Sequence, residues 1–328
     1  MAGFEWPFEA EVSPLLRRVR ELRELDGGTG THAETIAELE AHAHALAREI
    51  YAGLSPWDRV RLSRHPDRPY TLDILSRIAT DMVELSGDRR YADDAAIVGM
   101  LARIRGRSCV VVGHQKGRTA KENMRRNFGM PHPEGYRKAE RLYKLAERFK
   151  LPVITLIDTQ GAYPGIGAEE RGQSEAIGSC LATLSALQVP VVSVVLGEGG
   201  SGGALALGVA NRVAMLEFSI YSVITPEGCA SILWKDGTKA PLAAERLKIT
   251  AREVHALGVV DTLIVEPAGG AHTDYDFTAG AVGDYIESSL TALSGLTGRE
   301  LAAHRYRRFR ALGAYSGPLM RNGAWNSQ

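Results

Sequence analysis

The stretch that most constrains the fold covers residues 190–211, PVVSVVLGEGGSGGALALGVAN. Residues 191–196 are apolar and mostly β-branched, as in a buried strand, and the residues from 204 favour a short helix. Between them, five of the seven residues 197–203 are glycine. Glycine lets a ligand approach the main chain closely, and the free N–H groups at a helix start favour negative charge. The stretch therefore predicts a strand–turn–helix that holds a phosphate, a pyrophosphate or a developing oxyanion.

These glycines match more than one motif. Gly197, Gly199 and Gly202 have the G-x-G-x-x-G spacing of a dinucleotide site. Glu217 follows the next expected strand, where such a site would place an acid on a ribose. A Walker-type phosphate loop is excluded because no Lys-Ser/Thr pair follows. A plain glycine turn that packs a helix against a strand remains a further interpretation.

The same stretch also has the G-x-S-x-G pattern of a nucleophile elbow, in Gly199, Ser201 and Gly203. A serine nucleophile needs a histidine base, and His255 and His272 lie downstream. A serine hydrolase that uses Ser201 therefore stays open at this point.

A second glycine loop, DTQGAYPGIG at residues 158–167, directly follows an apolar strand expected at 152–157. Loops at the carboxyl ends of neighbouring parallel strands meet at one edge of a sheet, so the two loops are expected to form two walls of one crevice. Asp158 is expected to cap the turn rather than act as a base. Glu169, Glu170 and Arg171 are expected to cap the start of the next helix and to interact with its dipole.

Strands and amphipathic helices alternate through the body of the chain. Strands are expected at residues 108–113, 152–157, 191–196, 212–216 and 259–266. Helices are expected at residues 74–85, 136–150, 174–187 and from 279 to 313, with Phe149 among the inward residues of the second. Apolar strands separated by such helices are typical of an α/β body with parallel strands.

The pattern divides the chain into three parts. Residues 1–55 are expected to form a helical hairpin around a glycine hinge. Residues 56–290 are expected to form the main domain, and residues 291–328 are expected to form a helical tail. The second helix of the hairpin carries an apolar stripe that packs on the body or on a partner. His42 and His44 lie two residues apart on this helix and do not share a face, so no metal site is expected there.

Composition narrows the classes of partner. A formal net charge of +0 gives no reason to expect nucleic acid or a membrane surface. No apolar run is long enough to span a bilayer, no signal peptide is recognised, and three widely spaced cysteines fit a reducing cytoplasm. The basic run of Lys116, Arg118, Lys121, Arg125 and Arg126 favours a solvated charged face over an anion site.

Eight segments closely resemble the α-subunit of the bacterial acetyl-CoA carboxylase carboxyltransferase. They are RHPDRPYTLD, DRRYADDAAIVG, GHQKGR, RRNFGMPHPEGYRKAERL, GAYPGIGAEERGQSEAI, GEGGSGGALALG, YSVITPEGCASILWKD and GGAH. The resemblance spans residues 35 to 290 and implies a crotonase-like α/β fold, in which ββα units wind into a superhelix behind an N-terminal helical extension.

The resemblance also implies a reaction and a set of partners. In that family a carboxyl group moves from biotin on a carrier protein to acetyl-CoA, giving malonyl-CoA for fatty acid synthesis. It implies a heterotetramer of two α- and two β-subunits, with biotin carboxylase and the biotin carboxyl carrier protein as further partners. Zinc is expected only on the β-subunit, and no metal on this chain.

The family's site residues carry over to the two glycine loops. The backbone N–H groups of Gly202 and Gly203 would stabilise the biotin oxyanion. Biotin would contact the other residues of the loops, namely Gly161, Ala162, Tyr163, Pro164, Gly165, Gly199, Gly200 and Ser201. One position departs from the family, which usually has proline where this chain has Gln160. This departure leaves a paralogue that carboxylates another acyl-CoA open beside the acetyl-CoA enzyme.

Overall fold

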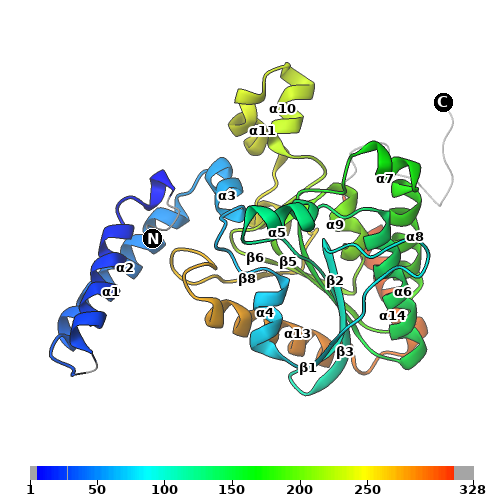
Figure 1. The fold of residues 1–328 in the computed structure, drawn as a ribbon, viewed down its shortest axis with the longest axis horizontal. Coiled ribbons are helices and arrows are strands. Elements are labelled where there is room, and N and C mark those ends of the chain that lie inside the picture. Colours follow the sequence, from blue (N-terminus) through cyan, green and yellow to red (C-terminus); the bar gives the residue numbers. More distant parts are fainter. Residues whose placement is uncertain (1–5, 28, 314–328) are drawn as a thin grey trace, which may run out of the picture.

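The computed structural model describes residues 6–27 and 29–313 and is built around one mixed sheet (Figure 1). Seven of its eight strands run in the order β1-β2-β3-β4-β5-β6-β8, and the eighth, β7, pairs with the carboxyl end of β5. The strands are β1 (Ala79–Glu84), β2 (Ile97–Ile104), β3 (Arg107–His114), β4 (Val153–Thr159), β5 (Val191–Gly200), β6 (Arg212–Leu216), β7 (Ile220–Ser222) and β8 (Thr262–Ile264).

The sheet is parallel from β3 through β4, β5 and β6 to β8, as the sequence predicted, but β1, β2 and β3 are antiparallel. The helix expected at 74–85 was wrong in its second half. It ends at Ile78, and the next residues form β1, which begins opposite Ile104 of β2. Met82 and Val83 are exposed, so strand pairing rather than burial of a helical stripe decides this segment.

Helices cover both faces of the sheet. Side chains alternate along β4, so Val153 and Ile157 contact the core on one face while Ile154 and Leu156 contact the other. The first face is covered by α6 (Pro133–Phe149), α8 (Gln173–Ala186), α9 (Ser201–Gly208) and α12 (Ala251–Ala256). The second is covered by α4 (Thr71–Ile78), α13 (Tyr275–Leu293) and α14 (Gly298–Arg310).

Two expectations about helices need comment. Phe149, expected to point inward, is 63% exposed because α6 ends there, at a left-handed Lys150. The boundary expected at residue 291 falls within α13. The last described helix, α14, packs on the body through buried Arg305, which donates to the carbonyl of Val189. Residues 314–328 of the expected tail lie outside the described part of the chain.

The N-terminal helices extend to one side of the sheet (Figure 1, blue). They are α1 (Ser13–Asp26) and α2 (Ala33–Ala52), which confirms the two predicted helices. Val12 and Tyr51 pack with Leu62 and Phe218 of the body, so the hairpin is anchored at its base. The shorter elements around the body are η1 (Pro7–Glu9), α3 (Pro56–Ser63), α5 (Ala120–Arg125), η2 (Asn127–Gly129), α7 (Ile166–Glu170) and η3 (Gly237–Lys239).

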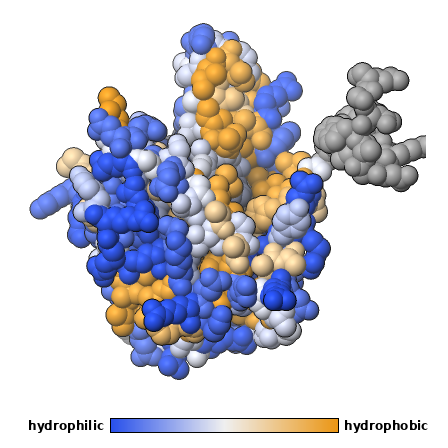
Figure 2. Space-filling model, turned by 90° about the vertical axis from the view of Figure 1, so that its right-hand side faces the viewer, coloured by the Kyte–Doolittle hydropathy of each residue, from blue (hydrophilic) through white to orange (hydrophobic). Residues whose placement is uncertain are grey.

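A second projection is formed by α10 (Pro226–Trp234) and α11 (Ala240–Leu247), which stand out from the edge of the body (Figure 1). Apolar side chains gather on it (Figure 2). Val223, Ile232 and Leu233 are 76%, 62% and 65% exposed. This is a larger exposed apolar group than a solvated helix pair needs, and such patches mark contact surfaces. Among the described residues, no helix is long and apolar enough to cross a membrane.

Candidate active site

The two predicted glycine loops meet at the carboxyl ends of β4 and β5. These strands pair in parallel, and after a shift in register Thr159 lies opposite Gly199. The main chains then touch: a Cβ on Gly200 would lie 2.1 Å from the carbonyl oxygen of Gln160. The two loops therefore lie against each other at one edge of the sheet, as predicted, and no larger residue fits at Gly200.

Gly203 makes the second close approach. A Cβ there would lie 2.8 Å from the carbonyl carbon of Gly161 and 2.9 Å from the nitrogen of Ala162. Gly202 differs, since its Cβ would meet only the flexible side chain of Ile177, at 3.4 Å. Gly203 thus holds the helix start against the upstream loop, while the position of Gly202 tolerates a methyl group.

The glycines do not form the turn that the sequence suggested. Gly197, Gly199 and Gly200 lie inside β5, which continues to residue 200 and pairs with β7. The chain turns at Ser201, whose φ of 52° is left-handed and unusual for a residue other than glycine. α9 begins there, and the first four N–H groups of a helix have no partner within it. These include the N–H groups of Gly202 and Gly203, and Gly203 lies directly against the loop from Gly161.

The upstream loop is anchored by the segment before α6. The N–H of Tyr163 donates to the carbonyl of Pro131, and the side-chain amide of Gln173 donates to the carbonyls of Pro131 and Tyr163, both at 2.9 Å. The ring of Tyr163 lies 4.3 Å from that of His132. Pro164 is exposed at the tip of this loop, which is otherwise held in place before any ligand binds.

A buried charge network lies behind the junction. Lys116 Nζ lies 2.7 Å from Asp158 Oδ1 and 3.1 Å from Glu198 Oε2, and Arg64 Nε lies 2.7 Å from Glu198 Oε1. Asp158 Oδ1 also accepts the N–H of Glu198 at 3.0 Å. One lysine therefore bridges the ends of β4 and β5, the two strands that carry the glycine loops.

The pKa values of this network follow from these contacts. Burial alone would lower the pKa of Lys116, but the charges of Asp158 and Glu198 outweigh it and raise that pKa. Burial alone would raise the pKa of Glu198, but Lys116 and Arg64 lower it. Lys116 and Glu198 are therefore both ionised at neutral pH. His114, buried beside the network, has its pKa lowered to about 3, first by burial and then by Lys116, so it stays neutral.

Sequence reasoning missed this network. The favoured interpretation of the basic run as a solvated face is wrong for Lys116, whose side chain is only 13% exposed and pairs with Asp158. Arg118 is exposed, as expected, although it also pairs with Asp73 and stacks on Tyr70. The interpretation also fits Lys121 and Arg125, which are exposed. The expectation that Asp158 caps the following turn is wrong, because its Oδ1 accepts the N–H of Glu198 on β5, while Thr159 Oγ1 accepts the N–H of Gly161 in the turn. The sequence offered one signal for this network: a lysine shortly after the strand expected at 108–113 and an aspartate directly after the strand expected at 152–157.

A hollow of about 250 Å³ opens beside the junction. Arg64, Lys116, Tyr70 and Phe128 line it together with Gln160. The side-chain amide of Gln160 donates to the sulfur of Met130 at 3.2 Å, and its main chain packs against the glycines of β5. Gln160, the position singled out in the sequence, therefore lies at the rim of this hollow.

The alternative motif interpretations fail on geometry. Within the described ranges 6–27 and 29–313, neither His255 nor His272 hydrogen-bonds Ser201: His255 is exposed on α12, and His272 lies near Glu9. Glu217 pairs with Arg252 at 3.1 Å rather than facing the glycines. The expected capping by Glu169, Glu170 and Arg171 is not seen. The two glutamates are exposed within α7, no side chain caps the start of α7 or α8, and Arg171 pairs with Glu134 at 2.6 Å.

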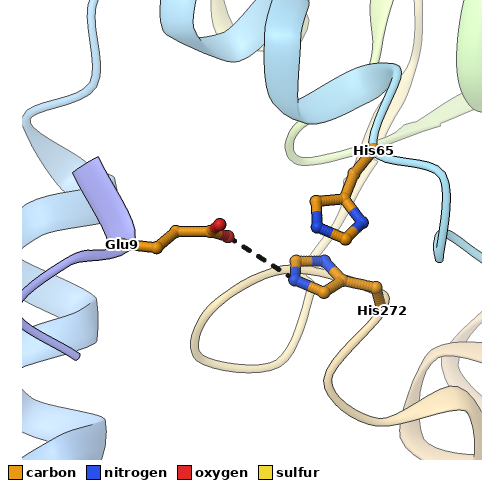
Figure 3. Close-up of side chains that lie close together, drawn as sticks. All are labelled: Glu9, His65 and His272. Carbon is orange, nitrogen blue, oxygen red and sulfur yellow. Dashed lines mark ion pairs between the residues drawn. The ribbon is translucent and has the colours of Figure 1, made fainter. Parts of the chain in front are cut away.

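One group of metal-ligating residues stands apart from the junction, formed by Glu9, His65 and His272 (Figure 3). Their ligand atoms lie within 4.8 Å of one another. The two imidazoles are stacked, with centroids 3.9 Å apart and planes 14° apart, so their lone pairs run side by side rather than converge on one ion. His65 Nδ1 accepts the N–H of Asp67, which leaves the proton of the neutral ring on Nε2. The geometry favours a hydrogen-bonded contact over a metal centre.

This contact ties the N-terminal segment to the body. Glu9 accepts the N–H of Trp6 at 2.6 Å and the hydroxyl of Tyr51 at 2.7 Å, and its carboxylate lies 3.6 Å from His272. Burial alone would raise the pKa of Glu9, but the bonds from His272, Trp6 and Tyr51 outweigh it and lower that pKa.

Glu9→Gln is expected to loosen the hairpin at neutral pH. Because the pKa of Glu9 is lowered on folding, its contribution is present above the ordinary glutamate pKa of about 4.3 and is lost as pH falls through the lowered value. Hydrogen exchange of α1 and α2 should therefore be faster in the variant at pH 7, with a difference that shrinks as the pH falls below the ordinary glutamate value. Glu11→Gln, at an exposed position nearby, is the control. Equal exchange in both variants at pH 7 would contradict the role of Glu9.

Comparison with known proteins gives one consistent family. The family described as "Acetyl co-enzyme A carboxylase carboxyltransferase-like" matches residues 5–313. A protein of Sorangium cellulosum named acetyl-coenzyme A carboxylase carboxyl transferase subunit alpha is 62% identical over 317 residues, which cover 97% of this chain and 100% of that protein. The protein of the same name from Thermus thermophilus is 53% identical over 312 residues, covering 95% of this chain and 99% of that protein.

Solved structures agree in fold. The transcarboxylase 12S core with hydrolysed methylmalonyl-coenzyme A superposes with a TM-score of 0.56 at 23% identity, over 70% of this chain and 42% of that chain. A Pseudomonas malonate decarboxylase hetero-tetramer in complex with coenzyme A gives a TM-score of 0.55 at 16% identity, over 67% and 90%. At these identities the likeness concerns the fold.

Proposed function

The chain belongs to the acetyl-CoA carboxylase carboxyltransferase family as an α-subunit, and we propose that its glycine junction is the half of the transfer site that serves biotin. The fold is crotonase-like, as predicted from the sequence. The activity is transfer of a carboxyl group from biotin on a carrier protein to acetyl-CoA, which gives malonyl-CoA. Three buried, free cysteines are consistent with a cytoplasmic enzyme.

The observation that carries the proposal is the contact between Gly203 and the loop from Gly161. It fixes the start of α9 so that the N–H groups of Gly202 and Gly203 stand preorganised beside the crevice. Biotin fits such a cradle because its ureido oxygen becomes negative when the carboxyl group leaves. The chain supplies backbone hydrogen-bond donors and holds them in position. Buried His114 stays neutral and does not act as a general acid.

The second half of the site is proposed to lie on a β-subunit. The relatives are named as one subunit of a larger enzyme. The apolar patch of Val223, Ile232 and Leu233 on the α10–α11 projection supports a partner contact, because a lone chain leaves it in water. We assign the acyl-CoA and the structural zinc to that partner, with an α2β2 assembly served by the biotin carboxyl carrier protein and biotin carboxylase.

The decisive test is reconstitution. The purified chain alone is expected to show no carboxyl transfer from malonyl-CoA to biocytin, and activity should appear on mixing with the β-subunit. Robust transfer by the lone chain would overturn the division of the site between two subunits. Acetyl-CoA is expected as the preferred acceptor in a panel of acyl-CoA thioesters. A preference for a longer acyl group would point to the specialised paralogue that Gln160 left open.

Ser201→Ala is expected to keep carboxyl transfer within about threefold of the parent enzyme, because Ser201 has no histidine partner and supplies no nucleophile. A fluorophosphonate probe should leave the chain unlabelled. The control is a serine hydrolase labelled under the same conditions. Labelling that disappears in Ser201→Ala would instead identify a serine hydrolase.

A further inference from the structure

A second hollow of about 250 Å³ lies on the outer face of α6. The inner face of that helix carries Tyr136 toward Gly203, so the hollow is separate from the glycine junction. The loop before β2 and the outer residues of α6 line it, and they bring five cationic and two acidic side chains together. These residues are Asp88, Arg89, Arg90, Arg137, Glu140, Arg141 and Lys144. The hollow therefore has an excess of three positive charges.

The two acids are engaged with other groups. Asp88 Oδ1 accepts the N–H groups of Arg90, Tyr91 and Ala92 at 2.9, 2.8 and 3.1 Å, so it shapes the loop. Its other oxygen lies 3.8 Å from Arg137 Nη1, beyond hydrogen-bond distance. Glu140 accepts the ammonium of Lys144 at 2.6 Å. Arg137 Nη1 also lies 3.8 Å from Glu134 Oε1, whereas Arg89, Arg90 and Arg141 form no ion pair with a described carboxylate.

Two arginines are held in place by carbonyl groups, which orient a guanidinium without neutralising it. Arg141 donates to the carbonyls of Gly87, Leu85 and Ser86, at 3.1 to 3.2 Å. Arg137 donates to the carbonyl of Arg171, and its buried Nε has no hydrogen-bond partner in the described part of the chain. Both keep donor capacity for a ligand.

Two more arginines stand at the rim. Arg89 adopts a left-handed φ of 64° in a turn closed by the bond from the N–H of Asp88 to the carbonyl of Ala92, at 3.0 Å. The side chains of Arg89 and Arg90 are exposed, and within the described residues neither guanidinium forms an ion pair. Burial, followed by the charge of Arg89, lowers the pKa of Arg141, as expected when positive charges repel one another.

We propose that this hollow binds the phosphate groups of a small soluble ligand. Arginine forks match phosphate oxygens in pairs, and a diphosphate would offset the excess positive charge. The turn that presents Arg89 and the carbonyls that hold Arg141 make this a shaped site, unlike the exposed Lys121 and Arg125 on α5. Two kinds of ligand carry such phosphate groups: coenzyme A, and a separate phosphorylated molecule.

Calorimetric titration of the full chain with inorganic pyrophosphate, without divalent cations and at fixed ionic strength, tests the proposal. One saturable site is expected, and the double variant Arg89→Ala/Arg90→Ala should bind about tenfold more weakly. Lys121→Ala/Arg125→Ala removes the same charge elsewhere and should bind like the parent. Absence of saturable binding, or equal weakening in both double variants, would overturn the site and leave a solvated basic face.

Competition then distinguishes the sources. Displacement of pyrophosphate by coenzyme A but not by dephospho-coenzyme A would identify the 3′-phosphate of the thioester carrier as the ligand. Failure of both to displace a bound pyrophosphate would identify a separate phosphorylated ligand. Because the titration needs no catalysis and no β-subunit, its result is independent of the carboxyltransferase activity.

Discussion

Gly203→Ala should lower kcat of the reconstituted enzyme by a hundredfold or more. The added methyl group would lie within 3 Å of the main chain of Gly161 and Ala162, which cannot move aside as a side chain can. The start of α9 must then shift, and loss of one oxyanion donor costs about 3 kcal/mol in the transition state. Steady-state transfer from malonyl-CoA to biocytin measures the effect.

Gly202→Ala is the matched control one residue away. Its methyl group meets only the end of Ile177, so activity within about threefold of the parent is expected. Both variants keep every backbone N–H and add the same methyl group. A difference in their activity therefore reports on where that methyl group lies. Circular dichroism and binding to the β-subunit verify that each variant is folded. Full activity in a folded Gly203→Ala enzyme would contradict the proposed donor geometry.

Lys116→Met should destabilise the chain by about 3 kcal/mol at pH 8, because loss of one partner leaves buried charge without compensation. Asp158 and Glu198 would then face each other with only Arg64 to offset them. The pKa of Glu198 is lowered in the folded parent, so its stabilising contribution is present above the usual carboxyl range and is lost as pH falls.

The pH dependence distinguishes this effect from simple loss of packing. Protonation relieves the unpaired carboxylates, so the destabilisation by Lys116→Met should be smaller at pH 5 than at pH 8. Urea unfolding at both values measures the difference in free energy. Lys121→Met, at an exposed position on α5, should change little at either pH. A loss of stability that is the same at pH 5 and pH 8 would assign Lys116 a packing role.

The sequence predicted the elements whose pattern is local. Residues 191–196 and 152–157 are apolar runs next to glycine loops, and the structure confirms the strands and their shared edge. It did not predict β1, because residues 79–84 have helical spacing and become a strand only by pairing with β2. Tertiary pairing overrides local preference at such edges.

The charge network lay beyond sequence reasoning for a similar reason. Lys116 belongs to a run of basic residues, and nothing local distinguishes it from exposed Lys121. Only the order β3-β4-β5 in the sheet brings Lys116 against Asp158 and Glu198. Likewise, the spacing of Gly197, Gly199 and Gly202 does not reveal that the first two of these glycines lie inside β5, whose end pairs with β7.

The pairing of β7 has a structural consequence. Residues 220–222 bond to β5 at Glu198, Gly199 and Gly200, and the chain then passes through Thr225 directly into α10. The α10–α11 projection is thus joined through β7 to the end of β5, which directly precedes the residues proposed as oxyanion donors. Only residues 223–225 separate β7 from α10, so the surface proposed to contact a second subunit lies a few residues along the chain from the strand that precedes the proposed donors.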